Sequence, residues 1–379
     1  MDLAGLLTNA RWMPSEERAR IAAAWHEPGK PGTLLLETCH RVELYGTPAA
    51  INDISAEASA GVHVLLGRDV ADHLVTVAVG RDSSVVAEDQ ILHQLRRATQ
   101  AARAGGHLSS ELDRLLDLAL SAGRRARSWL PARRPSLMDL ALTRVTGRQD
   151  LHGQRVLVVG TGEMGRAAIA HLHSRGATVS VASRTGESSH GAALKFGVAE
   201  SAFDPGPAVF ADMAGVVVAL KGDWAIERAT TDGLLAADAW IVDVSSPPAL
   251  EHGFAQALGG RLLTIDDLAS AGSVDVPSHT LLARLDGLIA ETVGQFERWA
   301  ANETRRDAAE ALTSRARAVE SAELERLWHR VPTLDDTQRA EVARALDHLT
   351  ESLLRDPLEQ LGRDGDDSHV RAAKELFRL

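Results

Sequence analysis

The segment from Gly160 to Gly165 constrains the fold of this chain more than any other stretch of the sequence. It reads Gly-Thr-Gly-Glu-Met-Gly and stands between a strand pattern over residues 154–159 and a helical pattern over residues 165–175. Three glycines at this spacing let the backbone turn tightly, approach a pyrophosphate and pack the helix against the strand. The pattern predicts a dinucleotide-binding domain with six cofactor-contacting residues: Gly160, Thr161, Gly162, Glu163, Met164 and Gly165.

Further apolar runs follow the glycine segment. Residues 177–182, 216–220, 240–244 and 261–265 each read as a short strand, in a region where strand and helix patterns alternate. Such alternation predicts a parallel, doubly wound sheet. We therefore predict a Rossmann-type nucleotide-binding domain over residues 135–270.

The end of the second strand indicates which nicotinamide nucleotide binds. NAD sites usually carry an acidic residue there, which holds the ribose 2′-hydroxyl. This chain carries Ser183, Arg184 and Thr185 instead, and an arginine with two hydroxyls suits a 2′-phosphate. The sequence predicts NADPH as the cofactor, contacted by these three residues. The alternative is that Arg184 is only an exposed loop arginine.

The regions on either side of this domain have a different character. Residues 1–134 combine a helix beginning near Pro14 and a short strand over residues 33–36 with a helical pattern over residues 70–129. We expect this pattern to break at Gly80, at Gly105–Gly106 and at Gly123. Residues 271–379 read as almost wholly helical, which is typical of an oligomerisation domain. At 379 residues, an α/β protein of two or three domains is expected.

Composition bounds the function classes. Apolar residues make up 45% and charged residues 25% of the chain, as expected for a folded soluble protein. No apolar run reaches the length of a membrane span, and the Met1 end lacks a signal-peptide pattern, so we expect a cytoplasmic protein without a membrane partner. A single cysteine excludes an intrachain disulfide and a multi-cysteine metal site. We interpret His171 and His173 as structural residues, because no acid or cysteine is nearby, and predict no metal site.

Cys39 is the candidate nucleophile. It follows the predicted strand and is flanked by Thr38, His40 and Arg41, and a nearby cation lowers the pKa of a thiol from about 8.5. In a nicotinamide enzyme this arrangement suggests thioester chemistry: the thiolate takes an acyl group, and hydride reduces the thioester to an aldehyde. The alternative is a small buried apolar cysteine.

Arginine is concentrated in one segment of an otherwise acidic chain. The net charge is −11, yet residues 94–134 contain nine arginines against three acids. One interpretation is a solvated helical face. The other is a surface that contacts the phosphates of a nucleic acid.

Several motifs resemble those of the glutamyl-tRNA reductase family. They lie, in order, at residues 36–45, 73–91, 115–128, 156–166, 242–247, 264–268, 353–357 and 375–379. The resemblance implies a homodimeric enzyme of tetrapyrrole (porphyrin) biosynthesis that uses NADPH to reduce glutamyl-tRNA to glutamate-1-semialdehyde through a thioester on Cys39. It implies an α/β protein of three parts: an N-terminal α+β catalytic domain (1–134), the NADPH-binding Rossmann domain (135–270), and a spinal helix with a C-terminal helical dimerisation domain (271–379). It also implies tRNA-Glu as the carrier and a possible aminotransferase partner that accepts the aldehyde.

The resemblance also implies roles for individual residues. Cys39 would be the nucleophile, and His73 would orient the substrate or handle a proton. The substrate-binding residues would be Thr38, His40, Arg41, Ser83, Glu88, Asp89, Gln90 and Gln94. Two of these positions depart from the family pattern, because His40 stands where the family has asparagine and Asp89 where it has proline.

Two other functions remain open from the sequence. The chain could be a divergent paralogue that reduces another aminoacyl or acyl thioester in a specialised pathway. It could also be a catalytically idle homologue that binds tRNA or a regulatory partner. The presence of Cys39, Arg41, His73 and the complete glycine segment argues against the idle homologue.

Overall fold

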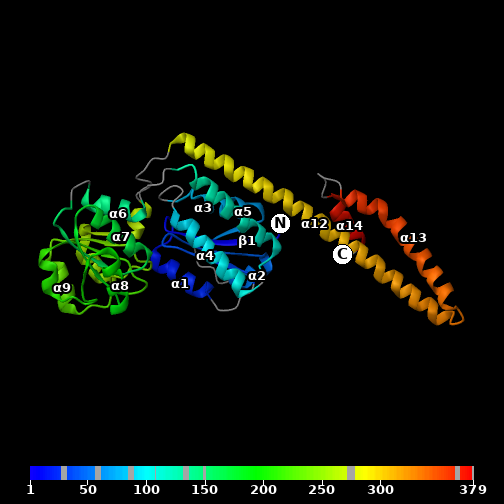
Figure 1. The fold of residues 1–379 in the computed structure, drawn as a ribbon, viewed down its shortest axis with the longest axis horizontal. Helices are drawn as coiled ribbons and strands as arrows, with labels where there is room; N and C mark the ends of the chain where they lie inside the picture. The colour runs from blue at the N-terminus through cyan, green and yellow to red at the C-terminus, as the bar shows by residue number, and fades with distance from the viewer. Residues whose placement is uncertain are drawn as a thin grey trace. The chain divides into compact units, whose positions relative to one another are not determined.

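The computed structural model describes residues 1–26, 32–55, 61–83, 89–106, 108–130, 136–147, 151–270, 278–362 and 368–377. Glu88, predicted to bind the substrate, lies outside these ranges, as do Arg133 and Arg134 of the arginine-rich segment. The chain divides into two compact units, residues 1–293 and 294–379. Within the first unit we call residues 1–130 the N-terminal domain and residues 136–270 the nucleotide domain (Figure 1).

The N-terminal domain is built on a four-stranded antiparallel sheet. Its strands are β1 (Ala4–Asn9), β2 (Leu34–Glu37), β3 (Arg41–Gly46) and β4 (His63–Leu66), in the order β2-β3-β1-β4. Every residue of β1 and β3 is buried. The predicted strand near residues 33–36 is confirmed as β2, whereas the other three strands were not predicted. β3 escaped prediction because its buried residues include Arg41, Glu43 and Tyr45, which do not form an apolar run.

Five helices accompany this sheet: α1 (Ser15–Trp25), α2 (Pro48–Ser55), α3 (Arg68–Val79), α4 (Asp89–Gly105) and α5 (Ser110–Arg127). In Figure 1, α3, α4 and α5 lie together beside β1. The predicted helix breaks at Gly80 and near Gly105 are confirmed, but the break at Gly123 is wrong. Gly123 lies inside α5, where a Cβ atom would come within 2.7 Å of the Ala78 carbonyl oxygen at the end of α3. A glycine is required there by close helix packing, not by a turn.

The nucleotide domain has the predicted parallel sheet. Its strands are β5 (Arg155–Val159), β6 (Thr178–Ala182), β7 (Ala199–Glu200), β8 (Met213–Val218), β9 (Trp240–Asp243) and β10 (Leu262–Thr264), in the order β10-β9-β8-β5-β6-β7. The helices are α6 (Leu137–Thr146), α7 (Glu163–Ser174), α8 (Gly186–Phe196), α9 (Arg228–Ala236), α10 (His252–Leu258) and α11 (Ile265–Ser270), with 3₁₀ turns at residues 207–212 and 259–261. The chain order reverses beside β5, so β5 and β8 form the switch point at which such sheets bind nucleotides.

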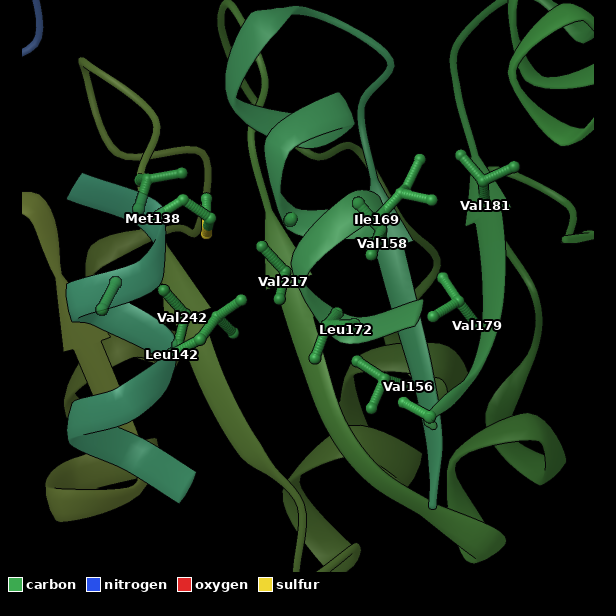
Figure 2. Packing of buried hydrophobic residues seen from close by; sticks show 14 of the residues in the cluster. Met138, Leu142, Val156, Val158, Ile169, Leu172, Val179, Val181, Val217 and Val242 are labelled. Carbon is green, nitrogen blue, oxygen red and sulfur yellow. The ribbon is translucent and has the colours of Figure 1, made fainter. Parts of the chain in front are cut away.

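Two apolar clusters form the core of the nucleotide domain. One contains residues of α6, α7 and the sheet. In Figure 2, Leu142 points from α6 toward Val242, and Ile169 and Leu172 lie on α7 beside the strand that carries Val156. α6 begins with a capping box, in which the Ser136 and Asp139 side chains each satisfy the other's backbone N–H. This helix therefore belongs structurally to the nucleotide domain.

The C-terminal part is helical, as predicted. It consists of α12 (His279–Arg330), α13 (Asp336–Gly362) and α14 (Ser368–Phe377). In the first unit, α12 contacts the N-terminal domain through ion pairs from Asp286 to Arg81 and from Glu291 to Arg125. In the second unit, a small cluster that includes Leu312, Leu361 and Val370 holds the helices together. Within the described ranges, no helix combines the length and the apolar character needed to cross a membrane.

Candidate active site

Cys39 lies in a tight connection between β2 and β3. The backbone N–H of Thr38 donates to the Arg41 carbonyl at 2.9 Å, and the Thr38 hydroxyl oxygen accepts from the N–H groups of His40 and Arg41 at 3.2 and 3.0 Å. The hydroxyl of Thr38 is thus engaged in shaping the loop. This arrangement holds the Cys39 side chain just beyond a strand end, as the sequence predicted.

A small cavity of about 30 Å³ surrounds Cys39. Its lining residues come from the β2–β3 loop, the end of α3, α4 and α6: Thr38, Cys39, His40, Arg41, Ser83, Gln90, Ile91, Gln94 and Leu137. Six of the predicted substrate-binding residues are therefore brought together around the thiol. Asp89 is not among the lining residues; its carboxylate is 84% exposed and lies 3.2 Å from the Nε atom of Arg127.

His73 does not line this cavity but is connected to it through Glu43. The Nε2 atom of His73 lies 2.9 Å from Oε1 of Glu43, and Nη1 of Arg41 lies 3.2 Å from the same oxygen. The Tyr45 hydroxyl donates to the other carboxylate oxygen at 2.6 Å. Arg41 faces the cavity as well, so the carboxylate of Glu43 links the predicted histidine to the predicted substrate pocket.

The electrostatics of Glu43 favour its charged form. Burial alone would raise the pKa of this carboxyl, but the Arg41 guanidinium and the hydrogen bonds from His73 and Tyr45 hold the pKa at about 2, below the ordinary 4.5. Sequence reasoning missed Glu43 and Tyr45. The pattern that could have predicted them is the alternation of Arg41, Glu43 and Tyr45, because residues two apart on a strand share a face.

The His40 side chain is half-buried, and its surroundings disfavour the protonated ring. Burial is the main cause that lowers its pKa to about 4, and the charges of Arg41 and Arg18 lower the pKa further. The His40 ring hydrogen-bonds to the backbone of Ile265, at the start of α11. The residue after the nucleophile therefore contacts the nucleotide domain.

Arg18 and Asp266 form a second contact at the same place. Arg18 is 1% exposed, and its Nη2 atom donates to the carbonyl of Cys39 at 2.7 Å and to Oδ1 of Asp266 at 3.2 Å. Neither residue was predicted from the sequence. They are 248 residues apart, and no local pattern marks such a pair.

The glycine segment has the geometry that a bound dinucleotide requires. Gly160 has a positive φ of 115°, and a Cβ atom there would overlap the Ala219 carbonyl oxygen. A Cβ atom at Gly165 would overlap the Gly160 carbonyl oxygen, whereas Gly162 at the start of α7 faces open space. The loop fits a pyrophosphate at the helix N-terminus, because backbone alone approaches the site. Its turn and close packing agree with the sequence-based interpretation.

Ser183, Arg184 and Thr185 lie beyond the end of β6, at the predicted ribose position. Nη2 of Arg184 donates to the Lys221 carbonyl in the loop after β8, at 2.8 Å. Ser183 and Thr185 use their hydroxyls locally, toward the Thr185 carbonyl and the Ser188 hydroxyl, each at 2.7 Å. An arginine has five N–H donors, so the one bond to Lys221 leaves donors available to a 2′-phosphate.

The cofactor loop and the Cys39 cavity adjoin each other. Nε2 of Gln90, which lines the cavity, donates to the Met164 sulfur of the glycine segment at 3.2 Å. Cys39 itself packs against the nucleotide-domain cluster that contains Leu137. The arrangement places a lone thiol beside a dinucleotide site, which is what acyl transfer to sulfur followed by hydride transfer requires.

A larger groove of about 780 Å³ lies between α1 and the loops after β8 and β9. Its lining includes Glu16, Arg20, Trp224, Pro247 and His252, and it shares no residue with the Cys39 cavity. The lining contains no cysteine. The nucleophile therefore identifies the smaller cavity as the candidate active site.

The arginines of the arginine-rich segment differ in their contacts. Arg127 donates to the carbonyls of Ala78 and Gly123, and Arg103 is paired with Asp113 and Asp117, so both are structural. Arg96, Arg97 and Arg124 are exposed.

The expectation that no acid lies near His171 is wrong, because the Nδ1 atom of His171 contacts the Asp139 carboxylate. This pair joins α7 to α6, which suits the structural interpretation of the histidine.

Three family models match successive parts of the chain. "Glutamyl-tRNAGlu reductase, N-terminal domain" matches residues 8–129, and "Shikimate / quinate 5-dehydrogenase" matches residues 139–271. "Glutamyl-tRNAGlu reductase, dimerisation domain" matches residues 284–379. The middle match identifies the domain that holds a nicotinamide cofactor.

Individual relatives agree with these matches. A glutamyl-tRNA reductase of Salinispora tropica is 32% identical over 93% of this chain and 84% of its own length. One of Kineococcus radiotolerans is 32% identical over 96% of this chain and 88% of its own length. The solved glutamyl-tRNA reductase of Methanopyrus kandleri is 25% identical, with a TM-score of 0.47, over 100% of this chain and 98% of that one.

Proposed function

The chain belongs to the glutamyl-tRNA reductase family, and on that basis we propose that it reduces the glutamyl group of glutamyl-tRNA to glutamate-1-semialdehyde with NADPH. In this proposal tRNA-Glu carries the glutamyl group, and the reaction is a step of tetrapyrrole biosynthesis. One observation carries the proposal: Cys39 lies in a polar cavity of which one wall, Leu137, belongs to the nucleotide domain. We place the reaction in the cytoplasm, where charged tRNA is made.

The proposed reaction has two steps on Cys39. Its sulfur attacks the ester carbonyl carbon, a C–S bond forms, and the ester C–O bond breaks as the tRNA leaves as an alcohol with the thiol proton. When bound, NADPH supplies a hydride to the carbonyl carbon of the thioester. The C–S bond then breaks, and the thiolate of Cys39 is restored as the aldehyde leaves.

The side chains around Cys39 bind and orient the glutamyl group in this proposal. Arg41 supplies positive charge for a carboxylate, and Ser83, Gln90 and Gln94 offer polar atoms within the same cavity. His40 lines the wall next to the thiol. Of the family's pocket residues, Glu88 lies outside the described ranges, and we assign Asp89 to the rim because its carboxylate is exposed.

In this proposal only one ring nitrogen of His73 can act on the substrate. One ring nitrogen, Nε2, contacts Glu43. We propose that Nδ1 orients the substrate or accepts a proton, while Glu43 fixes the tautomer of the ring.

NADPH rather than NADH is the proposed hydride donor. The support is Arg184 at the end of β6, which bridges to the loop after β8 and keeps further N–H donors, whereas the hydroxyls of Ser183 and Thr185 donate locally. The six residues of the glycine segment, 160–165, contact the pyrophosphate through backbone in this proposal.

We propose a homodimer assembled through the helical C-terminal domain, residues 271–379, with catalysis in residues 1–134 and cofactor binding in residues 135–270. The support is the dimerisation-domain match and the exposed apolar side chains of α12 and α13, among them Val319, Leu349 and Leu353. A reactive aldehyde favours direct transfer to an aminotransferase, which is the proposed downstream partner.

A second candidate is the reduction of a different aminoacyl-tRNA by a divergent paralogue. The observation that favours it is His40, a larger ring where the family has asparagine, in the wall of a small cavity. The two candidates differ only in the acyl group, so one experiment distinguishes them.

The test measures NADPH oxidation with a panel of charged tRNAs and identifies each aldehyde by mass spectrometry. Glutamyl-tRNA should be the preferred substrate. Without NADPH, labelled glutamyl-tRNA should leave a thioester on the wild-type enzyme. Cys39→Ser should bind NADPH normally but give neither thioester nor aldehyde. Full turnover by Cys39→Ser would refute the mechanism, and preference for another aminoacyl-tRNA would support the paralogue.

A further inference from the structure

Asp266 of the nucleotide domain binds two residues of the N-terminal domain. Its Oδ2 atom accepts from the Ser15 backbone N–H at 3.1 Å and from the Ser15 hydroxyl at 2.8 Å. Its Oδ1 atom accepts from Nη1 and Nη2 of Arg18, both at 3.2 Å. Asp266 lies at the start of α11, immediately after β10, at the carboxyl edge of the sheet where such domains hold the nicotinamide nucleotide.

Arg18 connects Asp266 to the β2–β3 loop, which holds Cys39. The same guanidinium donates to the Met13 carbonyl at 2.6 Å and to the Cys39 carbonyl at 2.7 Å. A single buried cation therefore joins a carboxylate of the cofactor-binding domain to the peptide group of the reactive cysteine. The next residue along the loop, His40, bonds to the backbone of Ile265, which precedes Asp266.

The charges make this contact dependent on how the two domains meet. Arg18 is 1% exposed, and a buried guanidinium that loses its counter-ion is strongly unfavourable. The carbonyls of Met13 and Cys39 satisfy some of its N–H groups but bring no negative charge. Asp266 brings that charge, and it does so only when the nucleotide domain lies against the β2–β3 loop.

We propose that Asp266 is a positioning residue that, through Arg18, ties the Cys39 loop to the nucleotide domain so that the acyl thioester is reduced rather than hydrolysed. The proposal rests on the proposed function. Asp266 touches neither the substrate nor the thiol in this proposal; it acts on the loop that carries them.

A thioester on Cys39 has two fates. Hydride adds to the carbonyl carbon and the C–S bond breaks to give aldehyde and thiolate, or water adds and the same bond breaks to give glutamate and thiol. Acylation needs only the loop and its pocket. Reduction also needs the nicotinamide at the correct distance, and a misplacement of about 1 Å can cost about a hundredfold in rate. Loss of the Asp266 contact should therefore affect reduction selectively.

The neighbouring carboxylate provides a matched control. Asp267 accepts from the Thr264 N–H at 2.8 Å and from the Thr264 hydroxyl at 2.6 Å, both inside the nucleotide domain. Asp266→Asn and Asp267→Asn thus remove one charge each from adjacent positions of one helix. Only the first changes the contact with Arg18.

The experiment is a single-turnover measurement with tRNA carrying labelled glutamate. Thioester formation is timed without NADPH, and the ratio of aldehyde to free glutamate is measured with NADPH. We expect Asp266→Asn to acylate within about threefold of wild type, to form aldehyde at least about tenfold more slowly and to release mostly glutamate. Asp266→Glu should recover part of the aldehyde yield, and Asp267→Asn should match wild type.

Three results would refute either the positioning role of Asp266 or the proposed function. If Asp266→Asn gives the wild-type ratio of aldehyde to glutamate, the positioning role is refuted. If its acylation and its NADPH affinity fall together, Asp266 supports the fold alone, and the proposal also fails. If wild type forms no thioester from glutamyl-tRNA, the proposed function itself is wrong, a failure recognisable before any variant is made.

Discussion

The Nε2 atom of His73 lies 2.9 Å from Oε1 of Glu43, a residue that is 1% exposed. A neutral histidine has one ring N–H and one ring lone pair. With Nε2–H donated to a carboxylate that stays ionised, the lone pair is on Nδ1. The buried carboxylate therefore decides which ring nitrogen of His73 carries the lone pair.

The first prediction concerns Glu43→Gln. The variant removes the nearer counter-ion of the buried Arg41 guanidinium and leaves only the Asp82 carboxylate, 4.0 Å away. Breaking a buried pair costs about 3–5 kcal/mol. We expect urea unfolding to show a loss of this order. Tyr45→Phe removes one hydrogen bond to the same carboxylate and should cost only about 1–3 kcal/mol. Equal stability of Glu43→Gln and wild type would contradict the ionised state of Glu43.

The second prediction is a pH dependence set by His40. Its folded-state pKa of about 4 lies below the ordinary 6.5, because of burial and the charges of Arg41 and Arg18, with Asp266 acting in the opposite direction. The unfolded chain therefore binds a proton that the folded chain does not, and the free energy of unfolding falls as the pH drops from 6.5 toward 4. Between pH 7 and pH 5 the loss should be about 2 kcal/mol.

His40→Asn should remove that part of the pH dependence. Glu43 affects the free energy of unfolding in a separate, lower pH range, because its stabilisation is lost as the pH falls from 4.5 to about 2. Chemical denaturation of both proteins at several values between pH 5 and pH 7 isolates the histidine. Parallel curves for wild type and His40→Asn would show that the surroundings of His40 do not disfavour its protonated ring.

The third prediction concerns cofactor choice. Arg184→Ala removes the cation proposed to contact the 2′-phosphate, a loss of about 1.5–3 kcal/mol for a hydrogen bond to a charged group. The dissociation constant for NADPH should rise about tenfold or more. NADH binding by the same variant is the internal control and should change little. Unchanged NADPH affinity in a fluorescence titration would overturn the assignment.

The fourth prediction separates the two classes of arginine. Replacing Arg96, Arg97 and Arg124 with alanine should weaken tRNA binding and flatten its salt dependence, by roughly 0.7–0.9 in log–log slope for each lost phosphate contact. Arg103→Ala is the control, since this side chain pairs with Asp113 and Asp117. If the triple variant binds tRNA like wild type across a salt series, the exposed arginines form only a solvated face.

The sequence predicted those features that depend on local pattern. Gly160, Gly162 and Gly165 define strand, turn and helix within a few residues, and the structure has β5 and α7 at those positions. The residues around Cys39 were also found, because the family motif names them directly. Arg184 at the end of β6 followed from the same kind of local rule.

The remaining features depend on residues far apart in the chain. The need for glycine at position 123 comes from the carbonyl of Ala78, and the burial of Arg18 is explained by Asp266. Neither neighbour is visible in a window of adjacent residues. Glu43 is an intermediate case. Its alternation with Arg41 along the strand was visible, but its partner His73 lies on helix α3, 30 residues away.

Leu137 lines the Cys39 cavity, yet it lies in α6 and packs in the core of the nucleotide domain. A fragment ending at residue 134, the border predicted from the sequence, would carry the thiol and lack one wall of its pocket. The complementary fragment would expose a leucine that is 2% exposed in the whole chain. Dissecting the protein for separate study would therefore change the solvent access of the nucleophile, even if each piece folded.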